Sequence, residues 1–269
     1  MSIFTNLGKK KLIIGLIHLK PLPGTPLYQE GDLELALEKA LKDAAALYKG
    51  GADGCLVQTV DRIYPAEDDA DYARVSAMAV ITHEVKKATA PSFHVGAQIM
   101  WNCITPSLAV AKVCGASFTR ATALTGTTTS TYGIVNANPL KVANYRKLIG
   151  AENVAIIAEI EGYHFHSFGA EMPIAQRARM AMNVGADAVE IMHGDEDINN
   201  KLVHDIKVAS PDTPVILGGK TDIENVRRRL KEANGALVGS CFENKNWGGN
   251  IDENIVREYM NIVRSMESK

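Results

Sequence analysis

The sequence predicts an α/β fold, a single (β/α)₈ TIM barrel that covers residues 1–269. Three observations lead to this prediction. The length of 269 residues is close to that of one complete barrel. Short apolar runs alternate eight times with amphipathic stretches, a pattern typical of parallel strands joined by helices. The last two apolar runs end in small residues, as do the strands that hold phosphate in many such barrels.

Eight strands are expected at the apolar runs. In chain order these are LIIGLIH (12–18), DGCLVQ (53–58), FHVGAQIM (93–100), SFTRAT (117–122), VAIIAEI (154–160), DAVEIMH (187–193), PVILGG (214–219) and GALVGSC (235–241). Helices are expected between them, for example at 33–50 and 223–234, where apolar residues recur with helical spacing. Gly51, Gly115 and Gly185 follow predicted helices, where a left-handed residue ends a helix. Eight repeats favour a closed barrel over an open, doubly wound sheet.

The composition is that of an ordinary globular protein. Hydrophobic residues make up 46% of the chain, charged residues 22%, and the formal net charge is −2. This charge gives no reason to expect nucleic acid as a partner, and no apolar run is long enough for membrane insertion. The four cysteines have no zinc or CxxC spacing, so we expect reduced thiols in a cytoplasmic protein. Formation of a homo-oligomer stays open.

Three charged side chains are expected inside the upper end of the barrel. Strand residues alternate between the barrel interior and the surrounding helices. On this alternation Arg120, Glu159 and Glu190 point inward from three consecutive strands. Two carboxylates beside a guanidinium can divide acid and base roles, because like charges move their pKa values apart. The alternative is a buried ion pair with a purely structural role.

Histidines follow several strands at the same end of the barrel. We expect His18 or His164 to act as a second proton carrier, because imidazole exchanges protons near neutral pH, and His193 to contact substrate. A metal-dependent hydrolase is an alternative, with ligands drawn from Glu159, Glu161, His164, His166 and His193. Because His-x-His on a loop is not a specific metal motif, no metal or other cofactor is predicted.

Further polar groups surround these charges. Side chains that offer both hydrogen-bond donors and acceptors, and so suit substrate hydroxyls or a carbonyl, are Gln58, Gln98, Asn102 and Thr122. A buried amide bonded only to backbone is the alternative for each amide. A phosphate is expected at the last two strand ends and the start of a short extra helix, at Gly218, Gly219, Lys220, Gly239 and Ser240. The polar stretch 125–133 is either a mobile lid or an ordinary loop.

Several stretches resemble the BtpA/SgcQ family in order along nearly the whole chain. They are IIGLIHLKPLPGTP (13–26), GGADGCLVQ (50–58), GAQIMWN (96–102), the turn Tyr132-Gly133-Ile134, YRKLIGAENVAIIAEI (145–160), GGKTDIENV (218–226) and NGALVGSCF (234–242). The resemblance implies a TIM barrel related to phosphate-binding barrels. The family's cyanobacterial namesake is linked to photosystem I biogenesis, and other members accompany sugar-uptake genes.

The polar rim differs from the pattern usual in that family. Glu159 replaces an aspartate, Tyr163 stands where a lysine precedes His164, and Gly218-Gly219-Lys220 replaces Gly-Ser-Gly. A divergent member is therefore expected. The preferred hypothesis is an isomerase, epimerase or lyase that acts on a small phosphorylated metabolite, a sugar or nucleoside phosphate, by paired proton transfer. The alternative outside enzymology is a non-catalytic assembly or biogenesis factor on an enzyme-like barrel.

Overall fold

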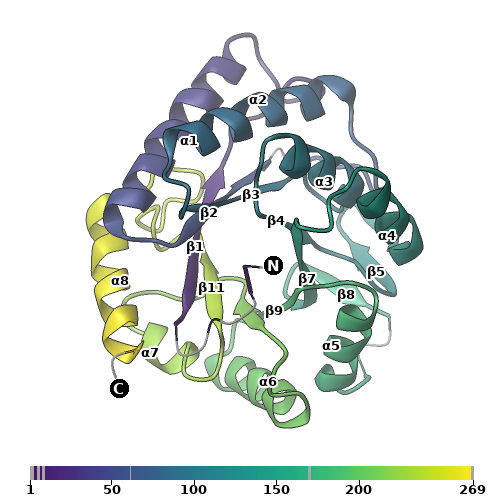
Figure 1. The fold of residues 1–269 in the computed structure, drawn as a ribbon, viewed down its shortest axis with the longest axis vertical. Coiled ribbons are helices and arrows are strands. Elements are labelled where there is room, and N and C mark those ends of the chain that lie inside the picture. Colours follow the sequence, from purple (N-terminus) through teal and green to yellow (C-terminus); the bar gives the residue numbers. More distant parts are fainter. Residues whose placement is uncertain (1–2, 5–6, 8–9, 61, 169–170, 268–269) are drawn as a thin grey trace.

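The computed structural model describes residues 3–4, 7, 10–60, 62–168 and 171–267. In these residues eight parallel strands close into a barrel with helices around it, which confirms the predicted fold class (Figure 1). Around the barrel the strands follow the order β1-β11-β10-β9-β7-β4-β3-β2. A second, three-stranded antiparallel sheet has the order β6-β5-β8 and was not expected from the sequence.

The elements have the following bounds. The barrel strands are β1 Leu12–His18, β2 Gly54–Gln58, β3 His94–Gln98, β4 Phe118–Ala121, β7 Ala155–Gly162, β9 Ala188–Met192, β10 Val215–Leu217 and β11 Gly235–Val238. The accessory strands are β5 Thr127–Ser130, β6 Gly133–Asn136 and β8 Phe165–Ser167. The helices are α1 Asp32–Gly50, α2 Tyr72–Ala88, α3 Ile104–Val113, α4 Pro139–Leu148, α5 Ile174–Asn183, α6 Glu196–Ala209, α7 Val226–Arg229 and α8 Glu253–Glu267.

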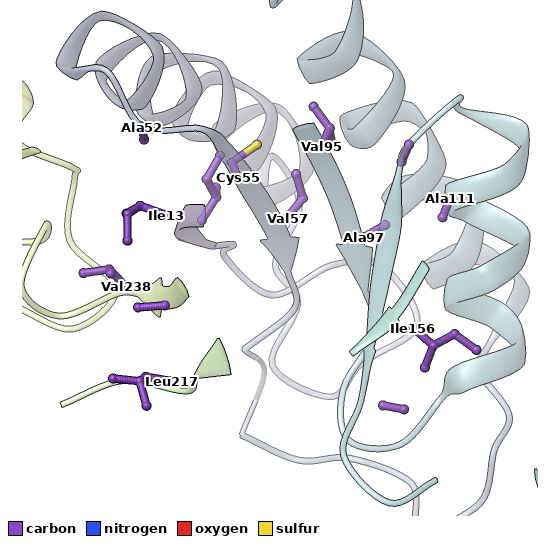
Figure 2. Close-up of a cluster of buried hydrophobic side chains, with 14 of the residues drawn as sticks. Ile13, Ala52, Cys55, Val57, Val95, Ala97, Ala111, Ile156, Leu217 and Val238 are labelled. Carbon is purple, nitrogen blue, oxygen red and sulfur yellow. The ribbon is translucent and has the colours of Figure 1, made fainter. Parts of the chain in front are cut away.

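The larger apolar core lies between the strands and the helices. Figure 2 shows part of it, including Val57 of β2, Val95 of β3 and Ala111 of α3, which belong to one cluster. Alternate residues of the same strands face the barrel interior instead, so Ile13 belongs to the outer core and Ile14 to the inner one. This alternation is what the period of two in a strand requires, and it fixes which side chains reach the barrel axis.

The inner core fills the lower half of the barrel. Phe4, from the segment before β1, is only 4% exposed and packs into this core. The strand residues around it are apolar and come from seven of the barrel strands: Leu12, Ile14, Leu16, Leu56, Phe118, Ala155, Ile157, Ala188, Ile216 and Leu237. Apolar side chains therefore close the barrel below, and polar groups on the same strands are left to the upper end.

The expected helix at 223–234 is much shorter in the structure. Only α7, Val226–Arg229, is helical, and turns flank it on both sides. Asp222 Oδ1 accepts hydrogen bonds from the backbone N–H groups of Glu224 and Asn225, at 2.9 and 3.0 Å. A side-chain oxygen that bonds the backbone two or three residues on favours a turn over a helix, which explains the late start.

Strand ends differ from prediction where they meet the site. The expected strands at 214–219 and 235–241 end at Leu217 and Val238, so the glycines that follow lie in loops. The stretch 125–133 is not an irregular loop. It forms β5 and the turn into β6, and β5 pairs with β8 from the loop after β7. All four cysteines are free, as expected.

Candidate active site

A cavity of about 940 Å³ opens at the carboxyl ends of the barrel strands. All eight strands, or the residues just after them, contribute to its lining. This is the end of a (β/α)₈ barrel at which active sites are found. Polar side chains lie at the base of the cavity and aromatic rings lie around its mouth, so the site offers both charge and flat apolar surface.

The three interior charges gather as the alternation predicted. Glu159 and Glu190 lie directly opposite each other on the paired strands β7 and β9. Arg120 of β4 donates two hydrogen bonds to Glu190, both at 2.6 Å, and its Nη2 lies 3.1 Å from Glu159 Oε2. Burial acts against the guanidinium charge, but the two carboxylates together raise the pKa of Arg120. The group is therefore a buried cation shared between two acids.

The two carboxylates have different environments. Glu190 is fully buried, is tied to Arg120 and does not line the cavity. A Cβ at Gly218 would overlap with Glu190 Oε1, so only glycine fits beside this carboxylate. Glu190 therefore holds Arg120 in position. Because Glu190 does not line the cavity, it is not placed to contact a substrate directly.

Glu159, in contrast, lines the cavity. Within the described part of the chain neither of its carboxylate oxygens has a hydrogen-bond partner. Burial raises the pKa of Glu159 to about 8, against the opposing charge of Arg120 and with a further contribution from Glu190. A carboxyl group with such a pKa exchanges its proton near neutral pH, which is what a general acid or base requires.

A second acid, Glu243, was missed by the sequence analysis. It follows β11, is 1% exposed, and its Oε1 lies 2.7 Å from Nδ1 of His18 at the end of β1. His18 lines the cavity, and its ring lies 5.4 Å from that of Trp247. A carboxylate on Nδ1 orients the imidazole and favours the tautomer that leaves Nε2 free to accept a proton. No motif marks Glu243, because the contact joins residues 225 positions apart.

The residues expected to hold phosphate all line one wall of the cavity. Gly219 and Lys220, after β10, have φ values of 136° and 59°, so two left-handed residues follow one another there. Gly239 and Ser240 follow β11, and a Cβ at Gly239 would come within 2.9 Å of His18 Cε1. Among the described groups, the backbone N–H of Gly219 and of Ser240 donates no hydrogen bond. Such free N–H groups on glycine-rich loops can bind an oxyanion.

The expected short helix after the last strand is a turn in the structure. Residues 240–245 form consecutive turns, with the Lys245 N–H donating to Ser240 O at 2.7 Å. The phosphate-binding prediction therefore rests on loop N–H groups and on Lys220 alone, without a helix dipole. The Lys220 ammonium lies 4.7 Å from the centre of the Tyr163 ring, at the rim of the same wall.

The expected substrate-binding residues separate into two groups. Gln58 and Thr122 line the cavity, whereas Gln98 does not, and its Nε2 lies 3.4 Å from Thr122 Oγ1. Asn102 does not reach the cavity, because its amide bonds both the N–H and the C=O of Ala123. His193 also lies outside the lining, since its Nδ1 accepts the N–H of Asp195 at the start of α6.

His164 lies at the mouth of the cavity. Its ring is 3.9 Å from that of Tyr163, and partial burial lowers the pKa of His164 to about 4, with the charges of Arg120 and Lys220 acting in the same direction. Such a histidine is uncharged at neutral pH and is a weak base. The low pKa of His164 makes it the weaker candidate for the second proton carrier.

The metal cluster considered from the sequence does not form. Within the described ranges no three His, Cys, Asp or Glu side chains come together as ligands. Glu161 points away from Glu159 and pairs with Arg177 of α5 at 2.8 Å. A β-bulge lies between Glu159 and Glu161 in β7 and accompanies the different directions of the two side chains.

Within the described residues, no helix is both long enough and apolar enough to cross a membrane.

Comparison with known proteins places the chain in a family. The model of the BtpA family matches residues 9–265. The chain belongs to the BtpA family. A photosystem I biogenesis protein, BtpA, from Synechocystis is 30% identical over 260 residues, with 95% of this chain and 87% of that protein covered. An uncharacterized protein from Archaeoglobus fulgidus is 32% identical over 259 residues, with 95% and 98% covered.

The fold of this BtpA family member is shared with solved enzymes of low sequence identity. Thiamine phosphate pyrophosphorylase from Pyrococcus furiosus is 18% identical, with a TM-score of 0.57, and 96% of this chain and 98% of that chain are covered. At this identity the likeness concerns the barrel and not its chemistry.

Proposed function

We propose that this BtpA family member is an enzyme that acts on a small phosphorylated metabolite by acid/base proton transfer. One observation carries the proposal above all. Two proton carriers lie on opposite sides of the cavity, and two glycine-containing loops with free N–H groups lie on the wall between them. In the barrel order β1 and β7 are four strands apart, with β11, β10 and β9 between them. A substrate bound by its phosphate at β10 and β11 would reach both carriers.

The charge of the cavity supports an anionic substrate. Only two acidic side chains of the described residues line it, Glu159 and Asp222. The lining contains five cationic side chains, Arg62, Arg120, Arg229, Lys220 and Lys245. Arg120 is paired with Glu190, but the other four cations still outnumber the acids of the lining, and a concave site with such an excess attracts anions.

The proposed chemistry assigns one role to each interior group. With a pKa of about 8, Glu159 carries its proton at neutral pH and serves as the acid. His18, oriented by Glu243, serves as the base and removes a proton from the substrate. Arg120 beside Glu159 stabilises the negative charge that develops on a substrate oxygen. Isomerisation, epimerisation and lyase reactions all need such paired proton transfer beside a polarised carbonyl.

The likeness to thiamine phosphate pyrophosphorylase agrees with a phosphate ligand, although it concerns the fold alone. A screen by thermal shift tests the proposal. The full chain is heated with pentose, hexose and triose phosphates, and a true ligand at a hundred times its Kd stabilises by about 2.7 kcal/mol. Lys220→Asn should weaken the shift because it removes the charge, while asparagine still tolerates the left-handed backbone at this position.

A non-catalytic role is the second candidate. It is favoured by the name of the 30% identical Synechocystis relative, a photosystem I biogenesis protein. The thermal-shift screen separates the two candidates. If no phosphate ester stabilises the wild-type chain, the proposed enzyme is excluded and the biogenesis role is preferred.

A further inference from the structure

We infer that the substrate is a nucleoside monophosphate, a phosphate ester that carries a planar base. This inference rests on the proposed function, because it takes phosphate binding at the β10 and β11 loops as given. The observation that carries it is an aromatic wall on the opposite side of the cavity, made of Tyr64, Trp101 and Tyr132.

The aromatic wall is a continuous and well-packed surface. The rings of Tyr64 and Tyr132 are 4.8 Å apart and nearly perpendicular, and those of Trp101 and Tyr132 are 6.3 Å apart. Trp101 is 2% exposed and packs edge-on against Phe165 of β8, at 5.9 Å. The accessory sheet thus supports the wall from behind. Flat, fixed rings that line a cavity are suited to stacking with another planar ring.

The wall lies across the barrel from the phosphate loops. Tyr64 follows β2, Trp101 follows β3, and Tyr132 lies in the turn between β5 and β6, which follow β4. In the strand order β3 is four positions from β10, and β4 is four positions from β11, so these pairs are diametrically opposite. A ligand with a phosphate at one end and a planar ring at the other therefore spans the cavity.

The proton carriers lie on the other diameter. His18 is on β1 and Glu159 on β7, also four positions apart. The two diameters cross near the centre of the cavity. When the phosphate and the base of a nucleotide occupy the two ends of the first diameter, the sugar between them lies between His18 and Glu159. The reacting carbon is then expected in the sugar part or at its bond to the base.

A second flat surface lies at the mouth, separate from the aromatic wall, near His18 and in the loop after β11. The Arg62 guanidinium lies 4.9 Å from the centre of the Trp247 ring, and Trp247 is 44% exposed. Stacked guanidinium and indole groups are suited to planar rings and to anions alike. The cavity volume of about 940 Å³ is near the top of the range of roughly 300–1,000 Å³ for ligand sites. A pentose phosphate alone has no planar ring that could stack on these aromatic groups.

Calorimetric titration of the full chain tests this inference. The probes are AMP, CMP, ribose 5-phosphate, adenosine and pyridoxal 5′-phosphate. We expect AMP and CMP to bind at least tenfold more tightly than ribose 5-phosphate. Tyr132→Ala and Trp247→Ala should each weaken AMP about tenfold and ribose 5-phosphate less than twofold, because only stacking is lost. Tyr132→Phe keeps the ring and should bind AMP as wild type does.

Tyr72→Ala is the matched control, because this tyrosine is 90% exposed at the start of α2 and does not line the cavity. Equal binding of ribose 5-phosphate and AMP to the wild type would overturn the inference and leave the proposed function intact. Tighter binding of pyridoxal phosphate than of either nucleotide would overturn the nucleoside assignment. If no phosphate ester binds, or if adenosine binds as tightly as AMP, the proposed phosphate site itself fails.

Discussion

Glu159 is the residue on which the proposed chemistry depends most. It is buried, faces the cavity and has no hydrogen-bond partner among the described groups. A carboxyl group in this position costs stability when it ionises, because water is excluded and Arg120 is already paired with Glu190. Acidic side chains with a strongly shifted pKa are concentrated at functional sites, because catalysis needs the shifted pKa even where it lowers the stability of the fold.

The raised pKa of Glu159 has a consequence for stability that needs no substrate. The pKa is about 8 in the folded chain and about 4.3 in an unfolded one. At pH values between these two pKa values, the unfolded chain has lost a proton that the folded chain keeps. The free energy of unfolding therefore falls as the pH rises, and it stops falling above about pH 8. Glu159→Gln should reduce this fall. Urea unfolding of both proteins at pH 5, 6.5 and 8 measures it, and equal pH dependence would contradict the assignment.

We expect that no residue larger than glycine is tolerated at position 218. A Cβ at this position would overlap with Glu190 Oε1 and so disturb the pair with Arg120. We expect Gly218→Ala to destabilise the fold by about 2 kcal/mol or more, because breaking a buried ion pair leaves charge uncompensated. Gly194→Ala is the matched control, since a Cβ there has no atom within 4 Å. Equal unfolding midpoints for the two variants would show that Glu190 adjusts without cost.

At the scale of single residues, strand periodicity predicted which charged side chains point into the barrel. It could not predict contacts made by residues in the loops, such as Glu243 and Asn102. Arg120, Glu159 and Glu190 gather because a period of two and the strand order determine their position. Glu243 was missed because a turn brings it under His18, and no local pattern encodes that contact. Asn102 was placed in the site because its side chain is polar, whereas the backbone of Ala123 satisfies it.

At the scale of elements, the accessory sheet is the feature that the sequence concealed. The polar stretch 125–133 has little apolar alternation, yet it pairs with β8 after a long intervening segment. One apolar cluster holds the sheet to the barrel, and its buried members are Trp101, Ala123, Val135 and Phe165. The sheet therefore connects the loops after β4 and β7 and supports the aromatic wall.

The accessory sheet should open independently of the barrel. Phe165 is 6% exposed and packs on Trp101, so Phe165→Ala removes much of the contact between sheet and barrel. We expect amide hydrogen exchange in β5, β6 and β8 to become at least tenfold faster, with the barrel strands unchanged. His166→Ala, an exposed neighbour in the same strand, should change neither. Faster exchange throughout the barrel would contradict independent opening.

At the scale of the whole molecule, the barrel has an apolar lower end and an upper end that holds the cavity. Apolar residues close the lower end around Phe4, and charges and aromatic rings occupy the upper end. The sequence predicted the barrel from its length and repeat number, and the charges at the upper end from strand periodicity, but not the apolar closure below. The exact length of α7 and the turn after β11 could not be predicted, because side-chain bonds from Asp222 and the packing of the last loop decide them.

Phe4 offers a test of that division. Truncation of a buried phenylalanine costs about 3–5 kcal/mol, so Phe4→Ala should lower the free energy of unfolding by that order. Ligand affinity should not change, since the inner core lies at the other end of the barrel. Phe168→Ala is the matched control, with a side chain that is 64% exposed, and should cost less than about 1 kcal/mol. A Phe4→Ala protein with weakened ligand binding would show that the ends are coupled.

The central claim is that the loops after β10 and β11 bind a phosphate group through their backbone. Titration of the ¹⁵N-labelled chain with ribose 5-phosphate, followed by amide NMR, tests it most directly. The account predicts that the amide signals of Gly219 and Ser240 move downfield and saturate together, because their N–H groups gain an anionic acceptor. The Gly194 signal, after β9, should stay in place. Unchanged signals at Gly219 and Ser240, with saturating changes elsewhere, would contradict the account.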